Sequence, residues 1–144
     1  MKAKLLVDTE AEKTWAIIFD TGEEAMAGLV AFAEQESIGA GHFTAIGAFS
    51  RAVLGYFDWQ TKQYARIPVD EQAEVVTLMG DIAVEKGKPK LHAHAALAKR
   101  GGVTVGGHFI EGHVRPTLEV VLSRSPAYLE RKFDEASGIA LIRI

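Results

Sequence analysis

The sequence contains no cysteine, which excludes disulfide bonds, thiolate metal sites and thiol nucleophiles at once. It also lacks long apolar runs, and no stretch approaches the length of about 20 residues that a membrane-spanning helix needs. The apolar part of residues 1–8 is too short for a signal peptide. These absences predict a cytoplasmic protein with no membrane partner, in which any metal is held by histidine or carboxylate side chains.

Positive charge is sparse and scattered along the chain. The 16 lysine and arginine residues stand against 19 acidic residues, which gives a net charge of −3, and no basic run is longer than Lys99-Arg100. Affinity for nucleic acid depends on clustered positive charge that neutralises phosphates. The sequence therefore predicts that DNA is at most a weak or indirect partner.

The composition is that of an ordinary globular domain. Apolar residues make up 48% and charged residues 24% of the 144 residues, close to the average of soluble proteins. A chain of this length buries about two thirds of the surface that its unfolded form exposes, which suffices for one core. No repeat, low-complexity tract or linker marks a boundary, so we expect a single domain over residues 1–144.

The apolar pattern predicts strands along most of the chain. Short runs rich in β-forming residues alternate with glycine, proline or polar clusters. Strands that follow one another so closely favour hairpins and an antiparallel sheet. The expected strands lie at residues 4–7, 14–20, 43–49, 52–58, 63–67, 75–84, 90–98, 103–110 and 117–123, with an edge strand at 139–144.

Two helices are expected beside these strands. Thr21-Gly-Glu-Glu24 has the form of a capping box, and apolar residues then recur at helical spacing to about Gln35. Ser125-Pro126 provides an N-cap followed by proline in the first turn, and Leu129 with Phe133 makes an apolar i, i+4 pair. The sequence thus predicts an α+β fold in which a large, mainly antiparallel sheet is flanked by two helices.

Four of the five histidines fall between positions 92 and 113. On a strand, His92 and His94 project to the same face, about 6–7 Å apart. If the turn at Gly101-Gly102 has an odd number of loop residues, His108 lies opposite His92 or His94 and faces the same way. Three imidazoles that converge in this way suit a divalent metal, zinc best of all, with one coordination position open. The alternative is that these histidines are hydrogen-bonded in the core or at a subunit interface.

Other polar residues are candidates for roles around this cluster. Glu119 and Glu111 offer carboxylates that can act as a general base or orient a ligand. His113 and Arg115 follow the cluster in sequence, and Arg115 suits an anionic ligand, with an exposed loop arginine as the alternative. We interpret His42 as structural. No serine or lysine lies in a nucleophile motif, and the glycine pairs precede strands rather than helices, so the sequence identifies no catalytic residue.

The order of several short motifs resembles that of the plant-and-prokaryote conserved (PPC) domain family. The resemblance covers nearly the whole chain, and its most specific part is His-x-His followed by Gly-Gly-His and Thr-x-Glu-Val. The motifs are Gly22-Glu-Glu24, Ile46-Gly-Ala48, Gly55-Tyr-Phe-Asp58, Leu91-His-Ala-His94, Gly106-Gly-His108 and Thr117-Leu-Glu-Val120.

The resemblance implies a curved, mainly antiparallel sheet flanked by helices and assembly as a homotrimer. It also implies a metal site at His92, His94 and His108, since the equivalent histidines of prokaryotic members can bind a metal. In land plants the domain follows AT-hook motifs that bind A·T-rich DNA, and bare prokaryotic domains are often called putative DNA-binding proteins. This sequence contains no Arg-Gly-Arg-Pro hook.

Three functions are consistent with these observations. The first is a homotrimeric binding module in which the three histidines hold a metal or a small-molecule ligand. The second is a metal-dependent hydrolase or lyase that uses the same cluster. The third is a DNA-associated regulator without an AT-hook.

Overall fold

Strands account for most of the chain, which a computed structural model describes over residues 1–144. Two long strands, β3 (Ala40–Asp58) and β7 (Thr104–Arg124), pair with each other antiparallel at its centre. Each of them continues through a segment where the sequence predicts two separate strands. The other strands are β1 (Lys2–Asp8), β2 (Lys13–Asp20), β4 (Gln63–Val69), β5 (Ala73–Glu85), β6 (Lys88–Ala98), β8 (Glu130–Asp134) and β9 (Ile139–Arg143).

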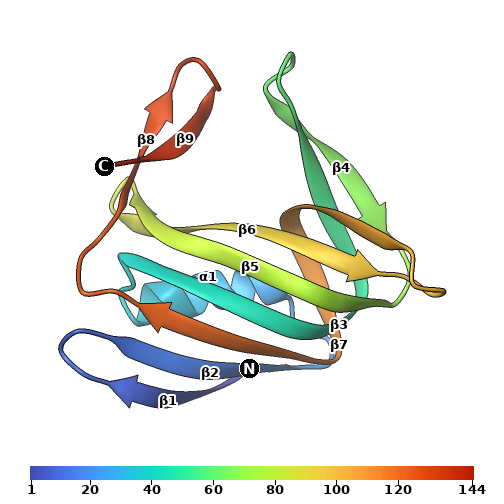
Figure 1. Cartoon of the computed structure of the whole chain (residues 1–144), viewed down its shortest axis with the longest axis horizontal. Coiled ribbons are helices and arrows are strands. Elements are labelled where there is room, and N and C mark those ends of the chain that lie inside the picture. Colours follow the sequence, from blue (N-terminus) through green and yellow to red (C-terminus); the bar gives the residue numbers. More distant parts are fainter.

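The pairing of β6 closes the sheet on itself. Because β6 pairs with both β5 and β7, the strands β3, β5, β6 and β7 form a closed circuit (Figure 1). β2 and β1 extend the sheet beyond β7, whereas β4 pairs with the outer half of β3. β8 joins β5 through one parallel bridge, Val84 to Glu130, and all other strand pairs are antiparallel. The sheet is therefore mixed.

The single helix α1 (Ala25–Gln35) covers one face of the sheet. Its Leu29 and Phe32 are buried, and the Phe32 ring packs edge to face on Trp15 of β2 at 5.5 Å. A Cβ added to Gly28 would overlap the ring of Phe19, so this glycine lets the helix lie close against β2. The helix has only 11 residues, fewer than the crossing of a membrane requires.

The first predicted helix is confirmed, although its N-cap residue differs from the predicted one. Glu24, not Thr21, is the N-cap: its carboxylate accepts hydrogen bonds from the backbone N–H of Met26 at 3.0 Å and of Ala27 at 2.6 Å. The hydroxyl of Thr21 instead donates to the carbonyl of Pro116. The helix therefore begins at Ala25.

The second predicted helix is wrong, because residues 130–143 form the β8–β9 hairpin. The backbone of Leu129 is used by the sheet: its N–H donates to Gly39 and its carbonyl accepts from Val84. Phe133 is 67% exposed, so the apolar pair that suggested a helix does not face a core. With 67% of residues in strands and one helix, the fold is mainly β rather than α+β with two helices.

The face of the sheet opposite α1 is open. On β3, Phe43 and Ala45 are buried, whereas Thr44 and Ile46 point outward with the two-residue period of a strand. Thr44 pairs with Val121 on one side and with Met79 on the other, and Met79 pairs with His94. Directly paired residues share a face of the sheet. The histidines of β6 therefore stand on this open face.

Candidate metal centre

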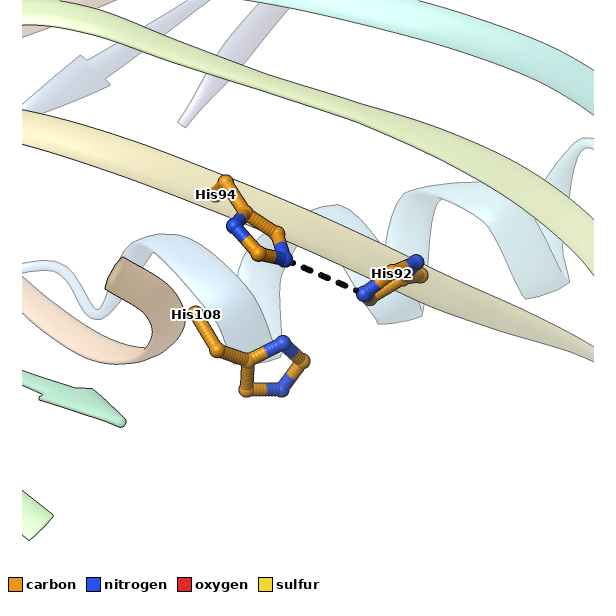
Figure 2. A group of neighbouring side chains, drawn as sticks. All are labelled: His92, His94 and His108. Atoms are coloured by element: carbon orange, nitrogen blue, oxygen red, sulfur yellow. Dashed lines mark hydrogen bonds between the residues drawn. The ribbon is translucent and has the colours of Figure 1, made fainter. Parts of the chain in front are cut away.

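Strand register brings the three predicted histidines together. His92 and His94 lie on β6, and His94 pairs directly with His108 of β7. Counting residues across the turn predicted that His108 lies opposite either His92 or His94, and in the structure its partner is His94. Since side chains paired across strands point to one face, the three rings converge above the sheet (Figure 2).

The nitrogen atoms of the three rings have the spacing of a ligand set. One nitrogen from each ring lies within 4.8 Å of the other two, and Nε2 of His92 is 3.3 Å from Nε2 of His94. Ligand atoms about 2.0–2.1 Å from a tetrahedral zinc ion are about 3.3 Å from one another. Figure 2 shows one ring nitrogen of His108 turned toward this pair. The donor set therefore fits a tetrahedral metal with one position left over.

Burial favours the neutral form of two of these imidazoles, those of His92 and His108. His108 Nδ1 is buried and has no hydrogen-bond partner. Desolvation by burial, together with the neighbouring His92 and His94, lowers the pKa of His108 to about 4. Burial also lowers the pKa of His92, which the carboxylate of Asp81 partly opposes. Neutral imidazole is the form that ligates metals, and an unpartnered buried nitrogen is what a ligand site without its ion presents.

Three residues that the sequence analysis did not select border the cluster. Tyr64 of β4 stacks on His108 with ring centroids 4.3 Å apart, and burial raises the pKa of its phenol. Asp81 of β5 lies opposite His92, with Oδ2 at 3.8 Å from His92 Nδ1. Arg131 of β8 pairs with the other side of the Asp81 carboxylate. Elements far apart in the sequence thus meet around the histidines.

Glu119 does not join the cluster. It lies on β7 opposite Ile18 of β2 and Ile46 of β3. At this end of β7, the strands β3 and β5 lie between it and β6, and three strand spacings amount to about 14 Å. Glu119 is therefore too far away to bind a metal that the three histidines hold.

His113 and Arg115 also lie apart from the three histidines. His113 Nε2 is 3.1 Å from Nη2 of Arg51 and 3.8 Å from Oε1 of Glu111, so both His113 and Glu111 belong to a separate polar group. Arg115 is exposed. His42 lies closer than its sequence position suggests, because it pairs with Asp81 from the β3 side, but its ring is not part of the ligand group.

Fold and site together define a class of protein: a mainly β domain whose open sheet face carries three converging histidines. The comparisons agree with this class and make it specific. The chain belongs to the Plants and Prokaryotes Conserved (PCC) domain family, whose sequence profile matches residues 7–126. No curated protein is significantly similar to the chain in sequence.

Solved structures with the same fold include a member of this family and proteins described in other terms. A plant- and prokaryote-conserved (PPC) protein of Pyrococcus horikoshii has 28% identity and a TM-score of 0.86, with 99% of this chain and 95% of that chain covered. A protein of Archaeoglobus fulgidus described as metal-containing has 33% identity and a TM-score of 0.84, with 100% of each chain covered. A putative DNA-binding protein of Ralstonia eutropha JMP134 has 25% identity and a TM-score of 0.84, with 90% of each chain covered.

Proposed function

We propose that the protein is a homotrimeric binding module that holds one divalent cation, zinc by preference, at His92, His94 and His108. The observation that carries the proposal is the donor geometry: two Nε2 atoms 3.3 Å apart and a buried Nδ1 without a partner. Three neutral nitrogen ligands leave the fourth position of a tetrahedral ion for a small ligand. A bound cation would supply an electrophilic anchor for an oxygen or nitrogen atom of that ligand.

The relatives support the metal more directly than they support a DNA partner. The Archaeoglobus fulgidus protein, 33% identical over the whole chain, is described as metal-containing. Zinc fits better than magnesium or calcium, because those ions prefer oxygen ligands and higher coordination numbers. Carboxylates are absent from the ligand group itself, which consists of histidines alone.

Assembly with other copies of the chain is supported by the open sheet face. Ile46 is 60% exposed, Met79 55% and Val121 50%, and their strands pair so that all three stand on the side opposite α1. Exposed apolar side chains gathered on one face in this way mark interaction sites in soluble proteins. In a closed trimer each copy would cover this face of its neighbour with another part of its own surface, and the closed ring would leave no interface open for further growth.

The experiment that tests the metal site is metal analysis of protein purified without a histidine tag and dialysed against zinc at neutral pH. We expect about one zinc ion per chain. His94→Ala should lose most of this zinc, since it removes one of three ligands and leaves the sheet core intact. His42→Ala is the matched control, because it removes a histidine from the same sheet face outside the ligand group. Wild-type protein with far less than one ion per chain would contradict the proposal.

A role in DNA association is a second candidate, favoured by the description of the Ralstonia eutropha relative as a putative DNA-binding protein. It requires that a chain with a net charge of −3 gather its basic residues on one surface. The third candidate, a metal-dependent enzyme, differs from the binding module and the DNA-associated regulator in one measurable property. Turnover that chelation abolishes and zinc restores would indicate catalysis.

A further inference from the structure

The carboxylate of Asp81 is the anionic group that borders the ligand cluster, and the metal-site proposal gives it no role. Asp81 pairs with His92 across β5 and β6, so the two side chains share the open face of the sheet. Its Oδ2 is 3.8 Å from Nδ1 of His92, which is longer than a hydrogen bond but close enough for the carboxylate to attract an N–H at Nδ1. The other nitrogen of the same ring, Nε2, faces His94.

Arg131 holds this carboxylate from the side away from His92. Its Nη2 donates to Oδ1 of Asp81, and its Nη1 donates to the carbonyl of Ala140 at 3.5 Å. The Arg131 residue is only 9% exposed, and its Nε has no partner, so Asp81 is the counter-charge of a buried guanidinium. The buried guanidinium thus holds the Asp81 carboxylate in place through Oδ1 and leaves Oδ2 on the side of His92.

The two ring nitrogens of His92 have different neighbours, and these neighbours decide which nitrogen carries the single proton of the neutral ring. With the proton on Nδ1, the N–H lies beside the carboxylate of Asp81, and the lone pair of Nε2 is left on the side of His94. With the proton on Nε2, a lone pair would face the carboxylate and an N–H would occupy the place of the ligand atom. The hydrogen bond or charge at one nitrogen selects which nitrogen is free to bind a metal.

We infer that Asp81, anchored by Arg131, is a positioning residue that fixes His92 in its Nδ1–H tautomer and so presents Nε2 to the cation. The role in metal binding rests on the proposed function, whereas the tautomer is a property of the protein alone. The C-terminal hairpin thereby contributes to the site from a distance, because Arg131 belongs to β8 and touches the cluster only through Asp81.

The first test needs no metal and no variant. Nitrogen chemical shifts of the histidine rings, measured on zinc-free wild-type protein at neutral pH, distinguish the two tautomers of a neutral imidazole. We expect His92 to be mainly in the Nδ1–H form. A mainly Nε2–H form would overturn the inference even if the protein binds zinc, and an Nδ1–H form would support it even if zinc does not bind.

The second test compares zinc affinities by competition with a chromophoric chelator. Asp81→Asn keeps the size of the side chain but turns an amide N–H₂ toward His92, with its carbonyl left for Arg131, and this favours the wrong tautomer. We expect zinc to bind about 10–100-fold more weakly, the usual effect of removing a group that orients a ligand. Circular dichroism of each variant ensures that only folded protein is compared.

The control variant is Arg143→Gln, which removes a different ion pair of the same hairpin. Arg143 Nη2 is 2.7 Å from Oδ1 of Asp134 and has no contact with the cluster. We expect its zinc affinity to stay within about twofold of wild type. An equal loss in both variants would show that the hairpin only needs to be tethered, and an unchanged affinity in Asp81→Asn would also refute the positioning role. Absence of zinc binding in wild type would instead refute the proposed metal site, with the tautomer measurement still deciding the role of Asp81.

Discussion

At the scale of single residues, protons and the proposed cation would compete for the same nitrogens of the cluster. His108 lies under the ring of Tyr64, and burial there lowers its pKa to about 4. The pKa of His92 is also lowered, chiefly by burial, with Asp81 acting in the opposite direction. Because the ligating form of histidine is deprotonated, the lowered pKa values keep His92 and His108 in that form under mildly acidic conditions.

The pH dependence of stability follows from the same shift. In the unfolded chain His108 has a pKa of about 6.5, so between about pH 6.5 and pH 4 the unfolded state binds the proton more readily than the folded state. We therefore expect the stability of the zinc-free protein to fall as the pH is lowered through this window. Denaturant unfolding of wild type and His108→Gln at several pH values measures the effect.

The comparison with the variant removes the contribution of carboxylates, which titrate in both proteins. The free energy of unfolding of wild type should decline relative to that of His108→Gln as the pH falls below about 6.5, and the difference should level off below about pH 4. Two curves that stay parallel across this range would show that His108 is protonated as easily in the fold as in the unfolded chain.

At the scale of elements, the start of α1 is linked by a hydrogen bond to β7, a strand far from it in the sequence. One carboxylate, that of Glu24, accepts from the helix N–H groups of Met26 and Ala27 and also from the backbone N–H of Gly112 in β7, at 2.9 Å. Beside it, the backbone N–H of Val114 donates to the carbonyl of Glu23 at 2.9 Å. The N-cap therefore fastens the helix to the central strand.

Replacing Glu24 should lower the free energy of unfolding by more than the loss of an ordinary helix cap does. In Glu24→Ala the helix loses its cap, worth about 0.5–2 kcal/mol, and the Gly112 N–H loses its acceptor, worth about 1–3 kcal/mol if water does not replace it. We expect a loss of about 2–3 kcal/mol in denaturant unfolding. Glu34→Ala, at an exposed position of the same helix, should change stability by no more than about 0.5 kcal/mol. A similar small effect for Glu24→Ala would refute the link.

Local sequence predicted the elements whose cause is local. Alternating apolar residues indicated the hairpin of β6 and β7, and counting across its turn placed His108 opposite the histidines of β6. The same counting across the turn at Lys86-Gly87, where both residues have positive φ, would have paired Asp81 with His92. The sequence therefore also contained the signal for this pair.

The C-terminal hairpin could not be predicted in this way, because its cause lies elsewhere in the chain. Ser125-Pro126 and the Leu129–Phe133 spacing agree with a helix, and local propensity alone favours one. The competing interactions are the backbone bonds of Leu129 to Gly39 and Val84 and the pairing of Arg131 with Asp81. These contacts depend on the finished sheet, so no pattern within residues 125–138 reveals them.

At the scale of the whole molecule, charge sets a limit on DNA association. The net charge of −3 and the absence of a basic run longer than two residues leave little electrostatic attraction for phosphates. We expect only weak, salt-sensitive binding to a short A·T-rich duplex, with no preference over a G·C-rich duplex of the same length. Fluorescence anisotropy at low and at physiological salt measures both. Sub-micromolar binding at physiological salt would contradict this expectation.

The open sheet face connects the fold to the proposed assembly. One small helix covers one face of a nine-stranded sheet, and the opposite face presents Ile46, Met79 and Val121 beside the histidines. Apolar side chains exposed in this arrangement gain free energy when another surface covers them, about 25 cal/mol for each Å² removed from water. A partner that covers this face would also lie close to the ligand cluster.

The last prediction concerns the mass of the protein in solution. Light scattering at micromolar concentration should give three times the chain mass of 15.6 kDa. Ile46→Asp places a charge on the open face without disturbing the core, because Ile46 is 60% exposed, and it should shift the mass toward that of a single chain. Val103→Asp is the matched control, since Val103 is 65% exposed in the turn before β7 and should leave the trimer unchanged. A single-chain mass for wild type would refute the trimer, and a trimer that survives Ile46→Asp would place the interface on another surface.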